Sequence, residues 1–318
     1  MRLVRIRPCD LQKGKCFMKN EIISIIGNLI LDRILIRDKC TNSCPGGTAF
    51  YSGMALAKLK ANVQLISKIG ADYPDHFLTT LMDEGINIDP VIKSKSKNST
   101  SFLLNYSDDL ESREASVPCR GPVITPEDIP GHINQSRVVQ LGMVANEIDP
   151  EVVSLLDHDN IHIIGADLHF IREISDDGKI TLGRGANFRP FMHKIDVIKG
   201  SFEEVRVFAD TENIKRALKK ISSMGPKIIL ATDGANGSIL YSKETFFKIP
   251  AYKVIVEDTT GAGDIFLSSF LYFYGIKQDD LLKSAYLASA AASFVVEGNS
   301  IRSLGNEEEI RKRAGTRL

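Results

Sequence analysis

Residues 254–275 read VIVEDTTGAGDIFLSSFLYFYG: an apolar run that ends at two acidic residues, then two glycines around an alanine, then a strongly apolar segment. This order predicts a strand end, a loop and the start of a buried helix. Amides at a helix start point outward with the positive end of the helix dipole, and glycines let an anion approach the backbone closely. The stretch therefore predicts an anion-binding turn at Gly261, Ala262 and Gly263.

Asp264 lies in the first turn of the expected helix, where the dipole favours a carboxylate. With an unperturbed pKa of about 3.9, it is expected to be ionised at neutral pH. Such a base suits phosphoryl transfer, because little charge builds on the attacking hydroxyl before the new bond forms. A plain helix start with a complementary acid explains the same residues, so local physics leaves both interpretations open.

The rest of the chain alternates short β-branched apolar runs with longer amphipathic segments. This alternation predicts an α/β fold in which helices cover both faces of a mostly parallel sheet, giving three layers. In one expected helix, Phe50, Met54, Ala57 and Ala61 form an apolar stripe at helical spacing. The expected strands lie near residues 21–27, 63–67, 138–141, 161–165, 195–199 and 227–231.

Two parts of the chain break this pattern, because apolar and polar residues alternate there without an intervening helix. They are residues 34–44 and the pair of segments 99–106 and 113–119. We expect them to form a small antiparallel flap, with lid segments near 33–45 and 98–121. Only thirteen residues separate Asp32 from Gly46, so the flap is expected to be short.

Composition limits the partners. Forty Lys and Arg balance forty Asp and Glu, so the global basic field that nucleic acid or an anionic membrane requires is missing. The densest apolar stretch, near residues 22–31, is too short to cross a bilayer. Five cysteines in 318 residues form no disulfide framework and indicate a reducing, cytoplasmic location. Small molecules are the expected partners.

The N-terminal seventeen residues carry five basic residues and no apolar core of a secretory signal. Met18 precedes the first expected strand, which begins near residue 21. We therefore expect residues 1–20 to be a disordered extension, with translation naturally starting at Met18.

Competing phosphate motifs are missing: the sequence has no GxxxxGK[ST], and neither residues 183–188 nor 261–266 supply the third glycine of GxGxxG.

Residues 258–273 resemble the C-terminal signature of the PfkB/ribokinase family of carbohydrate kinases, and residues 45–77 resemble its N-terminal signature. The order and separation match, and the resemblance extends from about Ile22 over the rest of the chain. It implies a three-layer ribokinase-like fold with a small β flap and one kinase domain over residues 21–318. It also implies that Asp264 is the base and that the amides of Gly261, Ala262 and Gly263 hold the transferring phosphoryl group.

The resemblance implies a substrate site as well. Residues 27–32, GNLILD, resemble the exit of the family's first strand, where Asn28 and Asp32 match positions that bind substrate hydroxyls. A carboxylate is a natural acceptor for a polyol. Gly46 and Gly47 match the diglycine that the sugar approaches. As alternatives, Asp32 is a turn residue and the diglycine a tight turn into the next helix.

The resemblance also implies positions that bind the metal ion and the nucleotide. Glu204 matches the Glu of an Asn-x-x-Glu element that organises Mg²⁺ through water, although Ser201 stands where Asn is usual. A helix start with acidic residues is the alternative. Thr232, Gly234 and Gly237 match the turn that approaches ATP, and a plain hairpin connection is their alternative. Arg172 is a candidate for a substrate contact or a solvated loop position.

The implied function is transfer of the ATP γ-phosphoryl group to a hydroxyl of a sugar or related polyol. Residues 48–51, TAFY, differ from the Lys-Gly-Ala-Asn of ribokinases, which makes ribose itself less favoured. A nucleoside or inositol kinase of the same fold, and a sugar or nucleotide sensor without catalysis, are the alternatives. Because the flap is short, a homodimer formed through it, as is common in the family, stays an open expectation.

Overall fold

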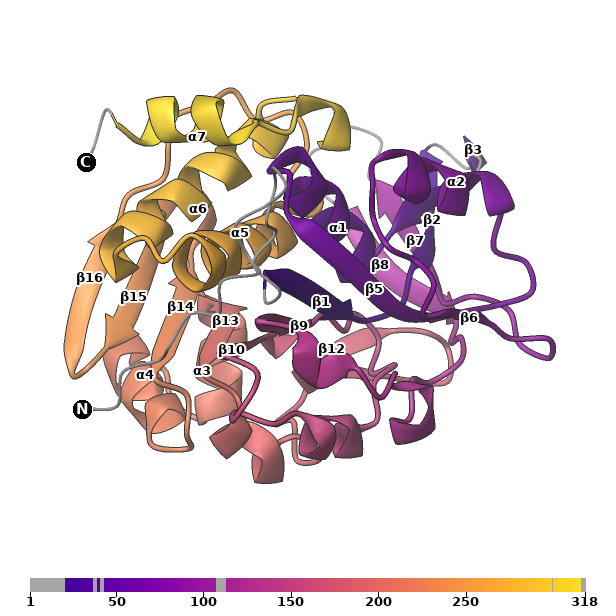
Figure 1. Ribbon diagram of the computed structural model, residues 1–318, viewed down its shortest axis with the longest axis horizontal. Helices are drawn as coiled ribbons and strands as arrows, with labels where there is room; N and C mark the ends of the chain where they lie inside the picture. The colour runs from indigo at the N-terminus through magenta and orange to yellow at the C-terminus, as the bar shows by residue number, and fades with distance from the viewer. Residues whose placement is uncertain (1–20, 37–38, 41–42, 107–112, 299, 316–318) are drawn as a thin grey trace, which may run out of the picture.

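A computed structural model describes residues 21–36, 39–40, 43–106, 113–298 and 300–315. The expected extension, residues 1–20, lies outside the described residues. A nine-stranded sheet forms the centre of the molecule (Figure 1), in the order β16-β15-β14-β13-β10-β9-β1-β5-β6. Its strands are β1 (Ile22–Ile26), β5 (Asn62–Ile69), β6 (Val91–Lys93), β9 (Val138–Leu141), β10 (Ile163–Asp167), β13 (Val197–Ser201), β14 (Ile228–Thr232), β15 (Ser238–Ser242) and β16 (Thr245–Ile249).

The strands from β6 to β14 in this order pair in parallel, and β15 and β16 extend one edge of the sheet in antiparallel fashion. The parallel strands are rich in Ile, Val and Leu because helices bury both of their faces. The predicted fold class, an α/β protein with a mostly parallel sheet, is confirmed.

Helices cover the two faces of the sheet. The core on one face includes residues of α1, α5, α6 and α7, and the core on the other face includes residues of α3 and α4. Figure 1 shows these two groups above and below the sheet. The helices are α1 (Thr48–Lys58), α2 (Asp75–Asp83), α3 (Phe202–Ala209), α4 (Ile214–Ser222), α5 (Ala262–Leu271), α6 (Leu281–Val296) and α7 (Glu307–Ala314).

One of the four residues in the predicted apolar stripe, Ala61, lies outside α1. The helix ends at Lys58, and Lys60 adopts a left-handed conformation with φ of 58°. Ala61 therefore lies beyond the helix, where the chain turns into β5. Phe50 and Met54 are buried as predicted, and Ala57 packs partly buried against the same core.

A second, smaller sheet lies beside the main one. Its strands β2 and β7 pair in parallel, whereas the other pairs in it are antiparallel. The prediction of an antiparallel flap is therefore wrong for the β2–β7 pair: these strands come from distant parts of the chain, so no hairpin turn dictates their direction. The strands are β2 (Ile30–Ile36), β3 (Lys39–Cys40), β4 (Cys44–Gly46), β7 (Ser101–Tyr106) and β8 (Arg113–Cys119).

A hairpin of β11 (Arg172–Ile174) and β12 (Ile180–Leu182) joins this small sheet to the main body. The Val117 amide of β8 donates to the Gly178 carbonyl at the hairpin tip, at 2.8 Å. Short helical turns complete the described chain: 3₁₀ turns η2 (Pro126–Asp128), η3 (Ile133–Gln135), η4 (Pro150–Leu155), η5 (Leu168–Ile171), η6 (Arg189–Lys194), η7 (Gly234–Asn236) and η9 (Ser300–Ser303), and the π-helical turn η8 (Tyr272–Ile276).

The strand order reverses at β1. From β1 the chain adds β5 and β6 on one side, and it later adds β9, β10, β13 and β14 on the other. In open α/β sheets, ligands bind beyond the carboxyl ends of the strands at such a reversal. Here the loops after β1 and β9 touch, because a Cβ on Gly27 would lie 2.2 Å from the Gly142 carbonyl oxygen. The topology thus predicts a ligand site in the space beyond β1 and β9.

Among the described helices, none has the length and apolar content needed to cross a membrane.

Candidate active site

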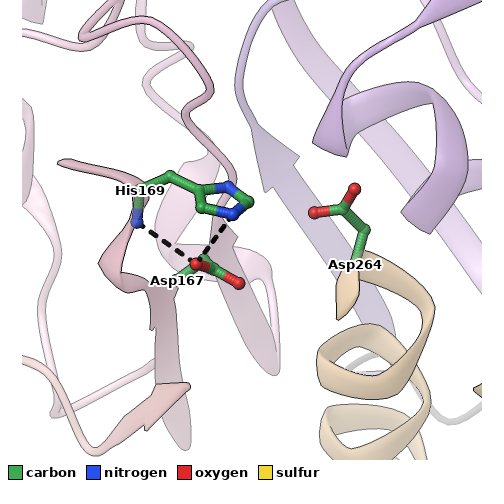
Figure 2. A group of neighbouring side chains, drawn as sticks. All are labelled: Asp167, His169 and Asp264. Atoms are coloured by element: carbon green, nitrogen blue, oxygen red, sulfur yellow. Dashed lines mark hydrogen bonds and ion pairs between the residues drawn. The ribbon is translucent and has the colours of Figure 1, made fainter. Parts of the chain in front are cut away.

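Asp264 lies in the first turn of α5, directly after the predicted glycine-rich turn. Gly261 precedes the helix in a left-handed conformation with φ of 77°. Apolar residues from Ile265 to Leu271 bury the rest of α5 in the core, which holds the helix start at the carboxyl edge of the sheet. Only 9% of Asp264 is exposed. Its carboxylate faces Asp167 and His169 (Figure 2).

Two hydroxyl groups of α1 hold Asp264. The Thr48 hydroxyl donates to its Oδ1 atom at 2.8 Å, and the Ser52 hydroxyl donates to its backbone carbonyl at 3.3 Å. Both residues are fully buried. The amide of Gln140 on β9 donates in turn to the Ser52 hydroxyl at 2.9 Å. The position of the carboxylate thus depends on α1 and β9 as well as on α5.

A buried ion pair lies beneath the glycine-rich turn. The Lys199 ammonium of β13 donates to Oδ2 of Asp167, the last residue of β10, at 2.7 Å. Lys199 is 4% exposed and Asp167 is fully buried. A Cβ on Gly263 would lie 2.6 Å from the Lys199 Nζ atom. The absence of a side chain at Gly263 therefore brings a buried positive charge against the start of α5.

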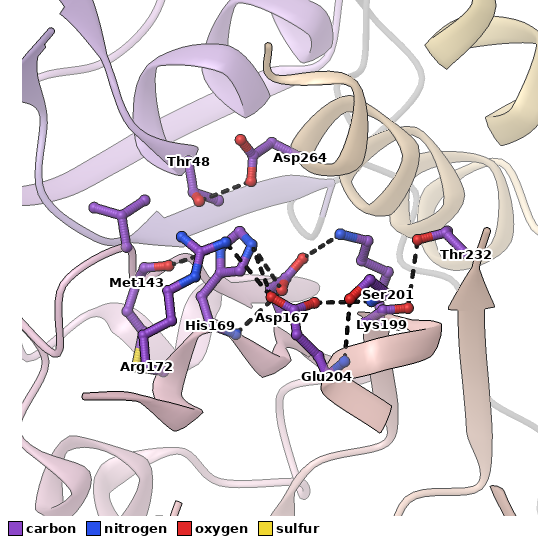
Figure 3. Close-up of polar contacts among 12 residues, drawn as sticks. Thr48, Met143, Asp167, His169, Arg172, Lys199, Ser201, Glu204, Thr232 and Asp264 are labelled. Atoms are coloured by element: carbon purple, nitrogen blue, oxygen red, sulfur yellow. Dashed lines mark hydrogen bonds and ion pairs between the residues drawn. The ribbon is translucent and has the colours of Figure 1, made fainter. Parts of the chain in front are cut away.

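His169, Arg172 and Glu204 continue this cluster (Figure 3). His169 Nδ1 lies 3.1 Å from the Met143 carbonyl oxygen, and Nε2 lies 3.3 Å from Asp167 Oδ1 and 3.8 Å from Glu204 Oε1. The Arg172 guanidinium is 3.5 Å from the same Glu204 oxygen. Acids and bases are thus interleaved at the carboxyl ends of β9, β10 and β13.

The environment shifts the pKa of Asp264 upward, contrary to the unperturbed value used above. Burial is the main cause, and the negative charge of Asp167 adds to it; His169, Lys199 and the Thr48 hydrogen bond act in the opposite direction. A raised pKa makes the carboxylate a stronger base than an exposed aspartate. Asp264 is therefore better suited to accept a proton than its sequence position indicates.

The pKa of Glu204 moves the other way. Burial opposes its ionisation, but the positive charges of His169, Lys199 and Arg172 lower its pKa to about 2. Burial and Arg172 lower the pKa of His169 itself, so we assign most of the effect on Glu204 to Lys199 and Arg172. Burial likewise opposes the charge of Lys199, but Asp167 and Glu204 raise its pKa. Glu204 and Lys199 are both charged at neutral pH.

The backbone amides of the glycine-rich turn are only partly available. The Ala262 amide donates to the Thr259 carbonyl at 3.2 Å, so a bound anion must exchange this bond to use it. Gly261 lies against the ring of Tyr51, which its Cβ would meet at 2.5 Å. Glycine is therefore required there by close packing and by its positive φ.

The expected substrate residues gather around the diglycine. The Asp32 carboxylate lies directly over Gly46, whose Cβ would be 2.0 Å from the Asp32 Oδ2 atom. Gly47 has φ of 89° and precedes α1, so the two glycines lie between Asp32 and the Thr48–Asp264 pair. Asn28 is 1% exposed. Its amide donates to the Pro122 carbonyl at 2.7 Å and accepts from the Lys68 amide at 2.9 Å, which gives it a scaffolding role.

Replacing Gly46 with alanine is expected to raise the KM of the phosphate acceptor by about 10- to 100-fold, equivalent to roughly 1.4–2.8 kcal/mol. The added methyl group would displace the Asp32 carboxylate. The matched control is Gly53→Ala within α1, where the new Cβ meets side chains at an ordinary 3.5 Å. Steady-state kinetics of both variants measure the effect. An unchanged acceptor KM in Gly46→Ala would contradict a role of Asp32 in acceptor binding.

Thr232, Gly234 and Gly237 line one cavity of about 520 Å³ beside the start of α5. The β14–β15 connection that carries them is a hairpin, as the alternative interpretation required. Ser238 lines the same cavity, and its buried hydroxyl lacks a hydrogen-bond partner among the described residues. The cavity wall is mostly apolar and includes Tyr252, Val254, Phe266, Ala292 and Val296.

Glu204 forms a capping box with Ser201 at the start of α3. The Ser201 hydroxyl accepts from the Glu204 amide at 3.1 Å, and Glu204 Oε2 accepts from the Ser201 amide at 2.8 Å. Ser201 thus performs the capping that Asn performs equally well. The helix can therefore begin with Ser201 at the position where Asn was expected. The alternative interpretation of Glu204, as an acidic residue in the first turn of a helix, also describes its local structure.

Sequence reasoning did not identify Thr48, Asp167, His169 or Lys199 as parts of this site. Asp167 ends β10, and Lys199 lies near the end of β13. Polar residues at the carboxyl ends of buried parallel strands are an available sign of a ligand site. Asp167, His169 and Asp264 also offer ligand atoms within 4.8 Å of one another. The Lys199 ammonium already supplies the positive charge there, which disfavours a metal ion among these three.

Comparisons with known proteins bear on the family and on the fold. The sequence profile of the pfkB family carbohydrate kinases matches residues 185–308. The deoxyribokinase of Salmonella typhi is 23% identical, over 81% of this chain and 83% of its own length.

Two solved structures share the fold. A pyrophosphate-dependent kinase of the ribokinase family, complexed with a pyrophosphate analogue and myo-inositol, has a TM-score of 0.73 and 22% identity, over 87% of this chain and 96% of its own. Vibrio cholerae fructokinase, bound to fructose, ADP and calcium, has a TM-score of 0.74 and 18% identity, over 93% and 99%. The chain thus shares the ribokinase-like fold of these structures, and its residues 185–308 are similar to the PfkB family of carbohydrate kinases.

Proposed function

We propose that the protein transfers the γ-phosphoryl group of ATP to a hydroxyl of a sugar or related polyol. Asp264 acts as the base, and the amides of Gly261, Ala262 and Gly263 bind the phosphoryl group. The observation that carries this proposal is the buried Asp264 carboxylate at the start of α5, which the Thr48 hydroxyl holds in place. The charge of Lys199 lies close by, beneath Gly263. Base and anion site are thereby adjacent.

In this reaction the acceptor hydroxyl oxygen forms a bond to the γ-phosphorus. The bond from that phosphorus to the β,γ-bridging oxygen breaks, and its electron pair leaves with ADP. The hydroxyl proton passes to Asp264, whose raised pKa favours this transfer. Lys199 and the start of α5 stabilise the negative charge on the phosphoryl oxygens.

The cavity beside α5 supports ATP as the donor. Its wall is mostly apolar and joins the start of α5 to the helix α6, where small side chains such as Ala292 leave room for a flat base. The Ser238 hydroxyl, which has no hydrogen-bond partner in the described part of the chain, supplies a polar contact for a nucleotide. Pyrophosphate needs only the anion site and leaves this apolar wall without an occupant.

Replacing Ala292 with phenylalanine is expected to raise the KM for ATP about tenfold or more, equivalent to at least roughly 1.4 kcal/mol. The ring would fill the space assigned to the base, while the acceptor KM is expected to stay the same. Rates with ATP and with pyrophosphate as donors are compared in both proteins. Turnover with pyrophosphate that Ala292→Phe leaves unchanged would identify pyrophosphate as the donor instead.

The residues near Glu204 fit a hydrated Mg²⁺ that is held through water. Glu204 is ionised, and among the residues that the structure describes its Oε1 atom has long contacts of 3.5 and 3.8 Å to Arg172 and His169. Mg²⁺ commonly keeps several waters and binds through few carboxylates and the phosphates of the nucleotide. When bound, the ion neutralises part of the charge on those phosphates. Oε2 is occupied by the capping box, so Glu204 offers one oxygen for this purpose.

The acceptor site supports a polyhydroxy substrate. The Asp32 carboxylate can accept hydrogen bonds from substrate hydroxyl groups, and the bare backbone of Gly46 and Gly47 lets a ring approach closely. The intact Asp264 also favours catalysis over a sensor without turnover, which has no use for a base.

The direct test is ADP release from Mg·ATP with a panel of sugars, sugar acids, inositols and nucleosides. Turnover is expected with at least one polyol and is expected to be lost in Asp264→Asn. Calorimetry that detects ligand binding without ADP release from any panel member would favour the sensor instead.

A further inference from the structure

Thr48 occupies an unusual place between the substrate turn and the base. It is the first residue of α1, directly after the diglycine, and it is fully buried. Its hydroxyl donates to Asp264 Oδ1 at 2.8 Å, across 216 positions of sequence. Figure 3 shows Thr48 above the cluster of acids and bases, with its hydroxyl directed at Asp264.

The side chain of Thr48 has little freedom. Threonine is branched at Cβ, which limits its χ1 rotamers. Its Cγ2 methyl group packs against Gly142 in the loop after β9, where a Cβ would approach that methyl to 2.5 Å. Gly142 therefore leaves space for the Thr48 methyl group in the orientation in which the hydroxyl donates to Asp264.

This contact occupies one oxygen of the base. An ionised carboxylate accepts at both oxygens, so a bond from Thr48 to Oδ1 leaves Oδ2 for an acceptor hydroxyl. The backbone carbonyl of Gly47 accepts from the Phe50 and Tyr51 amides at 3.0 and 3.1 Å, which fixes the diglycine to the first turn of α1. The turn that receives the substrate and the group that orients the base are one rigid element.

We propose that Thr48 is a positioning residue for the base, and that it orients Asp264 so that a single oxygen faces the acceptor hydroxyl. The proposal rests on the function proposed above, and it assigns to Thr48 an effect on the rate of transfer and not on the binding of either substrate.

The decisive variants are Thr48→Val, which keeps the branched shape and removes the donor, and Thr48→Ser, which keeps the donor. Thr48→Val is expected to lower kcat about 10- to 100-fold, with both KM values within about twofold, since the lost bond is one to a charged group. Thr48→Ser is expected to recover most of kcat. Thermal unfolding of both variants shows whether the fold is retained.

A second measurement does not depend on turnover. The Thr48 hydrogen bond favours the ionised form of Asp264, so the pKa of Asp264 in a carboxyl ¹³C NMR titration is expected to be higher in Thr48→Val than in wild type. The other charged groups that face Asp264, namely Asp167, His169 and Lys199, are the same in both proteins.

The outcomes separate the two proposals. A wild-type protein without turnover on any panel member overturns the proposed function, whereas the titration still tests the Thr48 contact. An active wild type with an inactive Asp264→Asn, together with a folded Thr48→Val of normal kcat and unchanged Asp264 pKa, overturns the role of Thr48 alone. A Thr48→Ser as slow as Thr48→Val also overturns it, because the serine hydroxyl retains the donor.

Discussion

Replacing Asp264 with asparagine is expected to lower kcat by about 10²- to 10⁴-fold, the range that general-base catalysis contributes. Asparagine keeps the size of the side chain, and its amide oxygen can still accept from the Thr48 hydroxyl, but it cannot take a proton from the acceptor. Because the side chain is buried at the start of α5, KM values are expected to change much less than kcat. Steady-state ADP release measures both.

The matched control for this variant is Asp258→Asn. Asp258 belongs to the same loop, and its Oδ1 atom accepts from the Thr260 amide at 2.9 Å, a contact that asparagine retains. This control is expected to retain the fold, because substitutions that break no named interaction change stability little. Its rate is therefore expected to stay within about threefold of the wild-type rate. If Asp264→Asn and Asp258→Asn had equal rates, Asp264 would not be the base.

Replacing Lys199 with methionine is expected to lower kcat by about 10²- to 10³-fold, as when a preorganised charge-stabilising donor is removed. The variant removes the positive charge beneath Gly263 and leaves the buried Asp167 without its partner at 2.7 Å. Breaking one side of a buried pair costs about 3–5 kcal/mol of unfolding free energy. Kinetics and chemical denaturation are measured on the same preparation.

Stability and catalysis are separated by adding Asp167→Asn to Lys199→Met. The double variant carries neither charge, and asparagine keeps the oxygen that caps the His169 amide at 3.2 Å. Removing both members of a buried pair is often close to neutral for stability, so most of the unfolding free energy is expected to return. Because the charge beneath the phosphoryl site is still absent, kcat is expected to stay low. Recovery of kcat along with stability would show that Lys199 acts only through the fold.

The parts of the site that lie within one continuous segment were predictable from sequence. The glycines, the acid and the apolar segment that follows them predicted a buried helix with Asp264 in its first turn, and α5 confirms this. The strand end expected in the apolar run before them is wrong: residues 250–258 form no strand, and Ile255 and Val256 are exposed. The pattern of the helix depends on neighbours a few positions away, which local backbone geometry decides.

Predictions that depended on contacts between segments were less complete. Asn28 matches a substrate-binding position, but its amide is engaged by Lys68 and Pro122. The Ala262 amide, expected to point outward, donates to Thr259. The flap strands β2 and β7 run parallel. In each case the partner comes from the local turn or a distant strand, and the motif itself carries no information on it.

The sequence by itself determined the glycine-rich helix start, the acid in its first turn, the parallel sheet around them and the family resemblance. Only the tertiary structure decided that Thr48 orients this acid, that Lys199 and Asp167 pair beneath it, and that burial raises its pKa. The physical reason is that a pKa and a hydrogen bond depend on which groups surround an atom in space. Here those groups come from α1, β10 and β13, which meet only when the sheet is assembled.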